Sequence, residues 1–223
     1  MREPEERVGR PAGGPAARRL EGMPAVLRPR RPEDFDAIYA GTPPWETGWP
    51  QPAFVALAEA GVFRGRVLDV GCGTGEHALL AASLGLEATG IDIAAAAIER
   101  AREKARQRGL TARFLVGNVL ELGGLGERFD TVLDSGLFHV LEDGDRPAFV
   151  DGLRAVIPPG GRYFMLCFSD QQPGYFGPRR ITQDEIRATF GAGWRIDSIE
   201  PAMMDNAVQR DAARCWLATI TRT

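Results

Sequence analysis

The stretch that decides the fold is Val67–Gly75, which runs Val-Leu-Asp-Val-Gly-Cys-Gly-Thr-Gly. Its first four residues predict the end of a short buried strand, and the glycines that follow predict a tight turn into a helix that continues to Leu84. Because glycine has no Cβ atom, this backbone can turn sharply and approach a ligand closely. Such a turn at the carboxyl end of a strand is where doubly wound folds bind nucleotides.

The chain around this turn alternates strands and helices. We predict strands at 66–70, 87–91, 112–116, 129–134, 162–168, 194–200 and 212–219, and helices at 51–60, 94–108, 145–156 and from 182 onward. Asp145 is the expected N-cap of its helix, and the run Thr182-Gln183-Asp184-Glu185 predicts a capping box. The predicted fold class is α/β, a doubly wound parallel sheet with helices on both faces.

Composition narrows the class of protein. The chain has 223 residues, of which 44% are hydrophobic and 26% are charged, which is typical of one soluble globular domain and excludes a fibrous or collagen-like chain. No apolar run approaches the roughly 18–20 residues that cross a bilayer, and the N-terminus lacks the apolar core of a signal peptide. Three cysteines without metal-ligand spacing indicate a reducing, cytoplasmic location and no metal site.

Residues 1–32 differ from the rest of the chain. They carry eight arginines against four glutamates, a net charge of +4, which leaves −7 for the remainder of a chain whose total is −3. We predict a disordered basic arm at 1–32 and a single catalytic domain at 33–223. The arm could bind nucleic acid or acidic lipid, but no aromatic or amphipathic pattern accompanies its charges, so we favour a plain extension.

Two acidic residues indicate which nucleotide binds the turn. Glu76 stands directly after Gly75, so the third glycine comes one place too early for a dinucleotide fingerprint, and its charge disfavours a pyrophosphate at the helix start. A cofactor without phosphates fits better. Asp92 ends the second strand 17 residues after Gly75, where a carboxylate can accept both ribose hydroxyls. The alternative is that Asp92 only caps the next helix.

Two residues of the turn itself have structural alternatives. Asp69 either holds the turn through backbone N–H groups or faces a ligand's ammonium group through water. Cys72 is expected to fill space rather than act as a nucleophile.

These features resemble the ordered motifs of class I S-adenosylmethionine-dependent methyltransferases over about residues 35–221. The matching segments are Asp69–Gly75, Asp92, Gly117–Leu120 and Phe129–Asp134. The resemblance implies a seven-stranded Rossmann-like sheet with a reversed final hairpin, and S-adenosylmethionine as the cofactor, which becomes S-adenosylhomocysteine. Many relatives have aspartate where this chain has Asn118, whose amide oxygen can still accept a hydrogen bond from the adenine amino group.

Residues 39–52 resemble the Pro-Pro-Trp-x-x-Gly-x-Pro-Gln-Pro segment of small-molecule methyltransferases. This group includes thiopurine, thiol and tellurite-resistance methyltransferases and the mycobacterial heterocyclic toxin methyltransferases. The resemblance implies that the segment folds over the cofactor, where Trp45 offers an aromatic face to a sulfonium or adenine. Trp49 replaces an arginine or glutamate of many relatives. The alternative is that both tryptophans only cover the sheet.

Together the motifs and these resemblances define an expected cofactor site. Its residues are Trp45, Asp69, Gly71, Cys72, Gly73, Gly75, Glu76, His77, Asp92, Ile93, Asn118, Val119, Leu120, Asp134 and Ser135.

His139 and Asp134 are the candidate catalytic residues. His139 ends the run Ser-Gly-Leu-Phe-His after the fourth strand, which closely resembles the toxin methyltransferases. A histidine with a near-neutral pKa suits a general base, and Asp134 could orient it. The alternative is a histidine that packs against the loop without titrating. The other histidine, His77, is expected to pack on the cofactor side.

Residues 169–181 form a long segment without periodicity, which predicts a cover over the acceptor pocket rather than an ordinary surface loop. Aromatic rings there suit a planar acceptor, and an arginine suits an acidic one. The expected substrate-binding residues are Tyr39, Trp49, His139, Tyr175, Phe176 and Arg179.

The sequence therefore predicts a small-molecule methyltransferase that acts on O, N or S of a planar, partly apolar acceptor such as a heterocycle, quinolone or phenol, in a detoxification role. A thiol or halide methyltransferase, which needs no base, and a non-catalytic S-adenosylmethionine-binding module stay open. Glu76 and the lack of a Tyr-x-x-x-Lys pair disfavour an NAD-dependent reductase. The run Asp134–Leu137 lacks the Pro-Pro core of nucleic-acid methyltransferases. We expect no nucleic-acid or membrane partner, and the oligomeric state is open.

Overall fold

The computed structural model describes residues 32–174, 177–207 and 212–223. The predicted arm therefore lies outside the described residues, apart from Pro32, which begins helix α1 (Pro32–Tyr39). Tyr175 and Phe176, two of the expected substrate-binding residues, also lie outside them.

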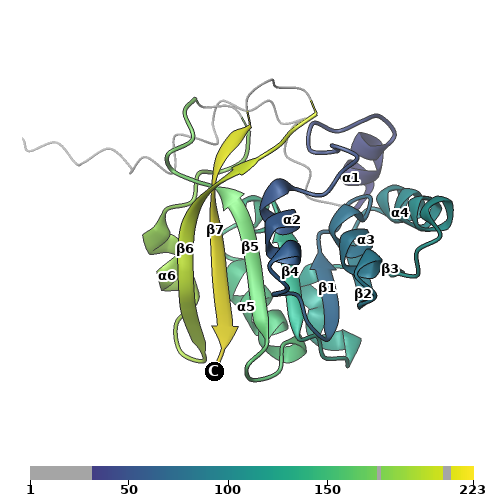
Figure 1. The fold of residues 1–223 in the computed structure, drawn as a ribbon. Coiled ribbons are helices and arrows are strands. Elements are labelled where there is room, and N and C mark those ends of the chain that lie inside the picture. Colours follow the sequence, from purple (N-terminus) through teal and green to yellow (C-terminus); the bar gives the residue numbers. More distant parts are fainter. Residues whose placement is uncertain (1–31, 175–176, 208–211) are drawn as a thin grey trace, which may run out of the picture.

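Among the described residues, seven strands form one sheet in the order β3-β2-β1-β4-β5-β7-β6 (Figure 1). The parallel strands are β1 (Arg66–Val70), β2 (Glu87–Asp92), β3 (Arg113–Val116), β4 (Thr131–Ser135) and β5 (Arg162–Phe168). Strand β7 (Ala213–Arg222) runs antiparallel to both β5 and β6 (Trp194–Met204). This arrangement confirms the predicted α/β fold class and the reversed final hairpin. The strand order changes direction between β1 and β4, the switch point at which such sheets bind ligands.

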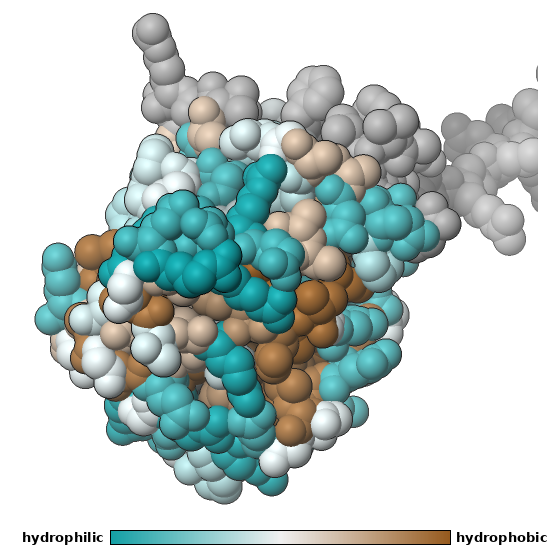
Figure 2. All heavy atoms as spheres, turned by 90° about the vertical axis from the view of Figure 1, so that its right-hand side faces the viewer, coloured by the Kyte–Doolittle hydropathy of each residue, from teal (hydrophilic) through white to brown (hydrophobic). Residues whose placement is uncertain are grey.

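Helices cover both faces of the sheet. One apolar core lies under α2 (Pro52–Glu59), α3 (Glu76–Ser83) and α4 (Ala95–Arg108), and the other under α5 (Arg146–Val156), α6 (Gln183–Thr189) and the 3₁₀ segment η3 (Val119–Leu125). Buried alanines let α4 pack closely on the sheet, while its outer positions are charged. On that side of the molecule, hydrophilic side chains cross the surface beside an apolar patch (Figure 2).

Most predicted elements lie where the sequence placed them, and the differences have physical reasons. Strand β6 continues past Glu200 through Pro201, which is acceptable because β6 is an edge strand, the kind of strand to which proline is confined within sheets. Asp145 occupies the N-cap position of α5 but makes no side-chain cap bond. The capping box between Thr182 and Glu185 is present. Within the described residues, no helix is long and apolar enough to cross a membrane.

Candidate active site

The turn between β1 and α3 can be built only from glycine. Gly71, Gly73 and Gly75 have φ angles of +63°, +51° and +87°, a region that other residues rarely adopt. A Cβ atom on Gly73 would lie 2.7 Å from the Tyr39 hydroxyl oxygen, and one on Gly75 would lie 2.6 Å from a ring carbon of Phe114. The result is a bare backbone cradle at the carboxyl end of β1, as the sequence predicted.

Asp92 holds this cradle from the neighbouring strand. Its Oδ2 accepts a hydrogen bond from the Gly73 N–H at 2.8 Å, and its Oδ1 accepts one from the Ala94 N–H at 2.9 Å. Burial raises the pKa of Asp92, and these hydrogen bonds to the ionised form oppose that shift. Each carboxylate oxygen keeps a second lone pair for a ligand. The capping contact and the ligand role that the sequence left as alternatives are therefore compatible.

Two buried side chains support the cradle from behind. Asp69 is 1% exposed, and its Oδ2 accepts a hydrogen bond from the Ala78 N–H of α3 at 3.2 Å. Asp69 therefore holds the backbone at the start of α3, which is the first of the two roles expected for it. Cys72 is also buried, and burial raises the pKa of its thiol well above the ordinary value. This environment suits a space-filling residue and not a nucleophile.

Glu76 and His77, both expected at the cofactor, have side chains that are engaged by other parts of the fold. Glu76 forms ion pairs with Lys104 and Arg108 of α4. The Nε2 atom of His77 accepts a hydrogen bond from the Gln51 N–H at 3.1 Å, and its ring packs edge-on against Phe54. Burial lowers the pKa of His77 to about 4. His77 therefore packs against the segment that leads into α2.

Asn118 follows β3 and begins η3. Its Oδ1 accepts a hydrogen bond from the Leu120 N–H at 3.0 Å, which leaves one lone pair on that oxygen for an adenine amino group. Four other expected cofactor residues lie near the carboxyl ends of the parallel strands. Ile93 follows β2, Leu120 follows β3 and Ser135 ends β4, and all three are partly exposed. Val119, beside Leu120, is buried.

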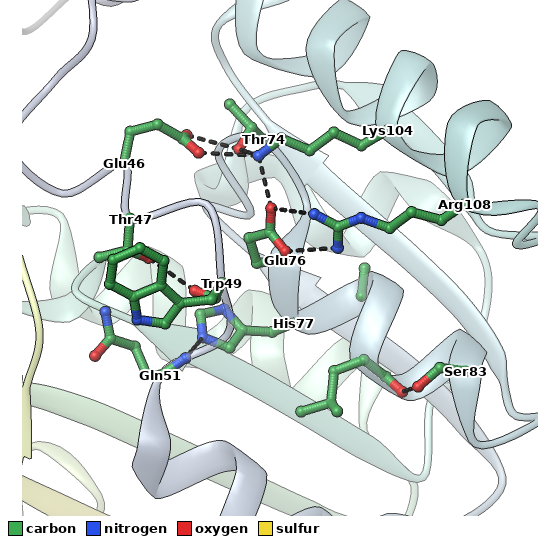
Figure 3. A network of polar contacts seen from close by, with 12 residues as sticks. Glu46, Thr47, Trp49, Gln51, Thr74, Glu76, His77, Ser83, Lys104 and Arg108 are labelled. Carbon is green, nitrogen blue, oxygen red and sulfur yellow. Dashed lines mark hydrogen bonds and ion pairs between the residues drawn. The ribbon is translucent and has the colours of Figure 1, made fainter. Parts of the chain in front are cut away.

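The segment between α1 and α2 is fastened to the cradle by charge (Figure 3). The Glu46 carboxylate accepts hydrogen bonds from the Thr74 hydroxyl at 2.6 Å and from the Lys104 ammonium at 2.9 Å. Lys104 also donates to Thr74 and to Glu76. We did not predict this network, which we call the Glu46–Lys104 latch. The available signal was that Lys104 is the single lysine among 27 basic residues.

The same segment is tied at its other end to the residues that follow β6. The Gln51 side-chain amide exchanges two hydrogen bonds with the Asp205 backbone, at 2.7 and 3.0 Å. The indole N–H of Trp49 donates to the Asp205 carboxylate at 3.2 Å, and that of Trp45 donates to the Tyr39 hydroxyl at 2.9 Å. Both tryptophan rings stay half exposed. The segment thus contacts both the glycine turn and the end of β6.

Replacing Lys104 with methionine is expected to release the segment. Glu46 and Glu76 would lose their common cation while partly buried, which predicts a loss of about 1–3 kcal/mol in the free energy of unfolding. We also expect S-adenosylhomocysteine to bind several-fold more weakly in calorimetric titration. Arg106→Met on the same helix is the matched control, since the one ion pair of Arg106 with a described residue is with Glu103 of α4. Equal affinity in the two variants would contradict the role of the latch.

Asp134 does not contact His139. Its Oδ1 accepts hydrogen bonds from the Leu137 and Phe138 N–H groups at 2.9 and 3.3 Å, and its Oδ2 accepts one from the Tyr163 hydroxyl at 2.6 Å. Burial raises the pKa of Asp134 to about 7, although all three hydrogen bonds oppose the shift. The expected orienting contact with the imidazole is absent. Asp134 instead fixes the turn that carries His139.

His139 is buried at the end of β4, with its ring edge-on to Phe168. Its Nδ1 accepts a hydrogen bond from the Phe168 N–H at 3.0 Å. Burial and the nearby Arg180 guanidinium lower the pKa of His139 to about 3. An imidazole nitrogen that accepts from a backbone N–H carries no proton, so the proton of the neutral ring is on Nε2. This arrangement does not favour the general-base role that the sequence suggested.

Two further expected substrate residues are already engaged within the protein. The Arg179 guanidinium forms ion pairs with Asp143 and Glu185, which tie the segment after β5 to the start of α6. Tyr39 is buried beside Gly73, and its hydroxyl accepts the Trp45 hydrogen bond, so it lies on the cradle side of the site. Two of these partners, Asp143 for Arg179 and Gly73 for Tyr39, are more than 30 positions away, so local sequence patterns give no signal for them.

The glycine turn and the turn that carries His139 meet at the switch point. A Cβ atom on Gly71 would lie 3.1 Å from the Leu137 side chain, so the cradle touches the turn that carries His139. A bare backbone loop, a buried carboxylate at the next strand and a buried histidine are thus brought to one edge of the sheet. Fold and site together define a Rossmann-like nucleotide-binding protein. The site fits a nucleoside better than it fits a pyrophosphate.

Comparisons with known proteins agree. Residues 67–161 match the family described as Methyltransferase domain. The chain is 36% identical to a 2-heptyl-1-hydroxyquinolin-4(1H)-one methyltransferase of Mycobacteroides abscessus over 168 residues, 74% of each chain. It is 32% identical to a probable thiol methyltransferase of Arabidopsis thaliana over 138 residues, which cover 60% of this chain and 61% of that one.

A solved structure from work on the conversion of a disulfide bond into a thioacetal group during echinomycin biosynthesis is also similar. It has a TM-score of 0.79 and 39% sequence identity, over 86% of this chain and 92% of that one. The chain belongs to the S-adenosylmethionine-dependent methyltransferases that act on small molecules. Its cofactor is S-adenosylmethionine.

Proposed function

We propose that this methyltransferase acts on an oxygen, nitrogen or sulfur atom of a small, planar, partly apolar acceptor, with a heterocycle of the quinolone type as the first candidate. The observation that carries the proposal is the contact between the glycine cradle and the turn that bears His139. The identity of 36% with a quinolone methyltransferase supports the choice of acceptor. We assign the catalytic domain to residues 33–223.

We propose that the cradle and its neighbours hold the cofactor. Gly71, Gly73 and Gly75 leave room for its methionine part, Asp92 accepts the ribose hydroxyls, and Asn118 meets the adenine. S-adenosylmethionine supplies an electrophilic methyl group when it is bound. The chain's own contribution is to align the acceptor with that group and to exclude water, because direct displacement depends on approach geometry. The segment around Trp45 and Glu46 covers the cradle and limits water access.

Two measurements test this function. Calorimetric titration is expected to show S-adenosylhomocysteine binding, and no binding at millimolar ligand would overturn the proposal. A screen of 1-hydroxyquinolin-4-ones, phenols, thiols and halides with methyl-labelled cofactor is then expected to give the highest turnover with the ring hydroxyls. Mass spectrometry of the products identifies the methylated atom.

A thiol acceptor is the second candidate, because a probable plant thiol methyltransferase is 32% identical to part of the chain. If thiols are the acceptors, aryl thiols are expected to have a higher kcat/KM than the corresponding phenols in the same screen. Cofactor binding without turnover of any acceptor would instead favour a non-catalytic binding module.

A further inference from the structure

The two histidines of the chain are held in opposite tautomers. The Nε2 atom of His77 accepts from the Gln51 N–H, so the proton of that ring is on Nδ1, which lies 4.0 Å from the Asp69 carboxylate. In His139 it is Nδ1 that accepts, from the Phe168 N–H, so the proton is on Nε2. Backbone geometry on each side therefore fixes which nitrogen of each ring can donate.

The Nε2 edge of His139 lies beside Gly136. A Cβ atom on Gly136 would lie 3.4 Å from both Nε2 and Cε1 of the ring, and 3.7 Å from the terminal methyl of Met204. Gly136 has a φ of +86°, so a side chain at this position would be strained. Among the described residues, no protein group accepts a hydrogen bond from Nε2. A donor is thus left open next to the turn that touches the cradle.

The charges around His139 oppose a protonated ring. The charged side chain that faces it is Arg180, whose guanidinium lies over the Phe168 ring and whose charge disfavours an imidazolium. The buried carboxylate of the same turn, Asp134, is directed to Leu137, Phe138 and Tyr163. A general base must hold the proton that it removes, and among the described residues no carboxylate is placed to stabilise it.

We propose that His139 is a neutral hydrogen-bond donor that binds an oxygen atom of the acceptor through Nε2–H, and that the enzyme methylates hydroxyl groups acidic enough to arrive ionised. This inference rests on the proposed function and narrows its substrate class to acidic hydroxyls conjugated to a planar ring. The hydroxyl proton leaves to solvent before binding. The oxygen–methyl bond then forms as the carbon–sulfur bond breaks, and the electron pair of that bond returns to sulfur.

The tautomer can be tested without cofactor or acceptor. In ¹⁵N-labelled full-length protein, long-range ¹H–¹⁵N spectra resolve two histidine rings, which the variants His77→Gln and His139→Gln assign. We expect one ring protonated on Nδ1 (His77) and one on Nε2 (His139), with the His139 signals unchanged from pH 8 to pH 5. An Nδ1–H ring at His139, or a titration of that ring near pH 6.5, would overturn the proposal.

Kinetics test the chemical role separately. With phenols and 1-hydroxyquinolin-4-ones of graded acidity, the midpoint of the rising limb of kcat/KM against pH is expected to follow the pKa of each acceptor. His139→Ala is expected to lower kcat/KM ten- to hundredfold, the effect of losing a hydrogen bond to a charged oxygen. His139→Gln, which offers an amide N–H but is no base, is expected to recover at least part of this loss.

A general base would give a different pH dependence. A rising limb that stays at one pH for every acceptor and disappears in His139→Gln would show a general base and overturn the donor role. If S-adenosylhomocysteine binds and no acceptor of the panel is methylated, the proposed function fails, and the tautomer measurement still decides the state of His139.

Discussion

Replacing Asp92 with alanine is expected to weaken S-adenosylhomocysteine binding by an order of magnitude or more. The variant loses the carboxylate that we propose accepts the ribose hydroxyls and that also holds the Gly73 and Ala94 N–H groups. A charge-assisted hydrogen bond is worth about 1.5–3 kcal/mol, so the loss of one such bond to the ligand already accounts for a tenfold change. Calorimetric titration measures the effect directly.

Asp36→Ala is the matched control for this variant. The Asp36 Oδ1 accepts a hydrogen bond from the Ala96 N–H at 2.9 Å, so it also caps the start of α4, but from α1. We expect Asp36→Ala to lower stability by about 1 kcal/mol, as for other lost caps, and to leave affinity within twofold. Unchanged affinity in Asp92→Ala would show that the carboxylate is a cap alone.

Gly75→Ala is expected to have the largest effect on stability. The new Cβ would lie 2.6 and 2.8 Å from two ring carbons of Phe114 and 3.0 Å from the Ala101 Cβ, at a φ of +87°. Left-handed strain costs about 1–2 kcal/mol and overpacking about 1–3 kcal/mol, so the free energy of unfolding should fall by about 2–5 kcal/mol. Urea unfolding followed by circular dichroism gives this value.

Gly85→Ala separates the two contributions. Gly85 has a similar φ of +78° at the end of α3, but nothing lies within 4 Å of a Cβ atom there. It should therefore show the strain alone, about 1–2 kcal/mol. Equal losses in the two variants would mean that Phe114 and Ala101 move aside, and that the tight packing between the glycine turn, α4 and β3 adds nothing to stability.

Local patterns were sufficient for the framework of the fold. Alternation of apolar strands and helices predicted the parallel sheet, and the capping box at Thr182 was recognisable because its residues are only three apart. The strand boundary at Glu200 was wrong, because the acceptability of Pro201 depends on β6 being at an edge. Edge position is a property of the whole sheet and has no signal within the strand.

Side-chain partners distant in the chain were beyond local reasoning. Lys104 looked like a compositional exception, yet it meets Glu46 across 58 positions. Asp134 stands five residues before His139 in the chain, which suggested a contact, but the intervening turn directs its carboxylate to backbone N–H groups and to Tyr163. Arg179 likewise pairs with Asp143, 36 positions away.

The sequence by itself determined the glycine turn and the acid that supports it, because both depend on short-range rules: glycine where φ is positive, and a carboxylate where a buried strand ends. Only the tertiary structure decided the state of His139. Its tautomer follows from the Phe168 N–H, 29 residues away on the neighbouring strand β5, and its low pKa from burial beside Arg180. A proton's position depends on which groups surround the ring, and those groups are brought together by folding alone.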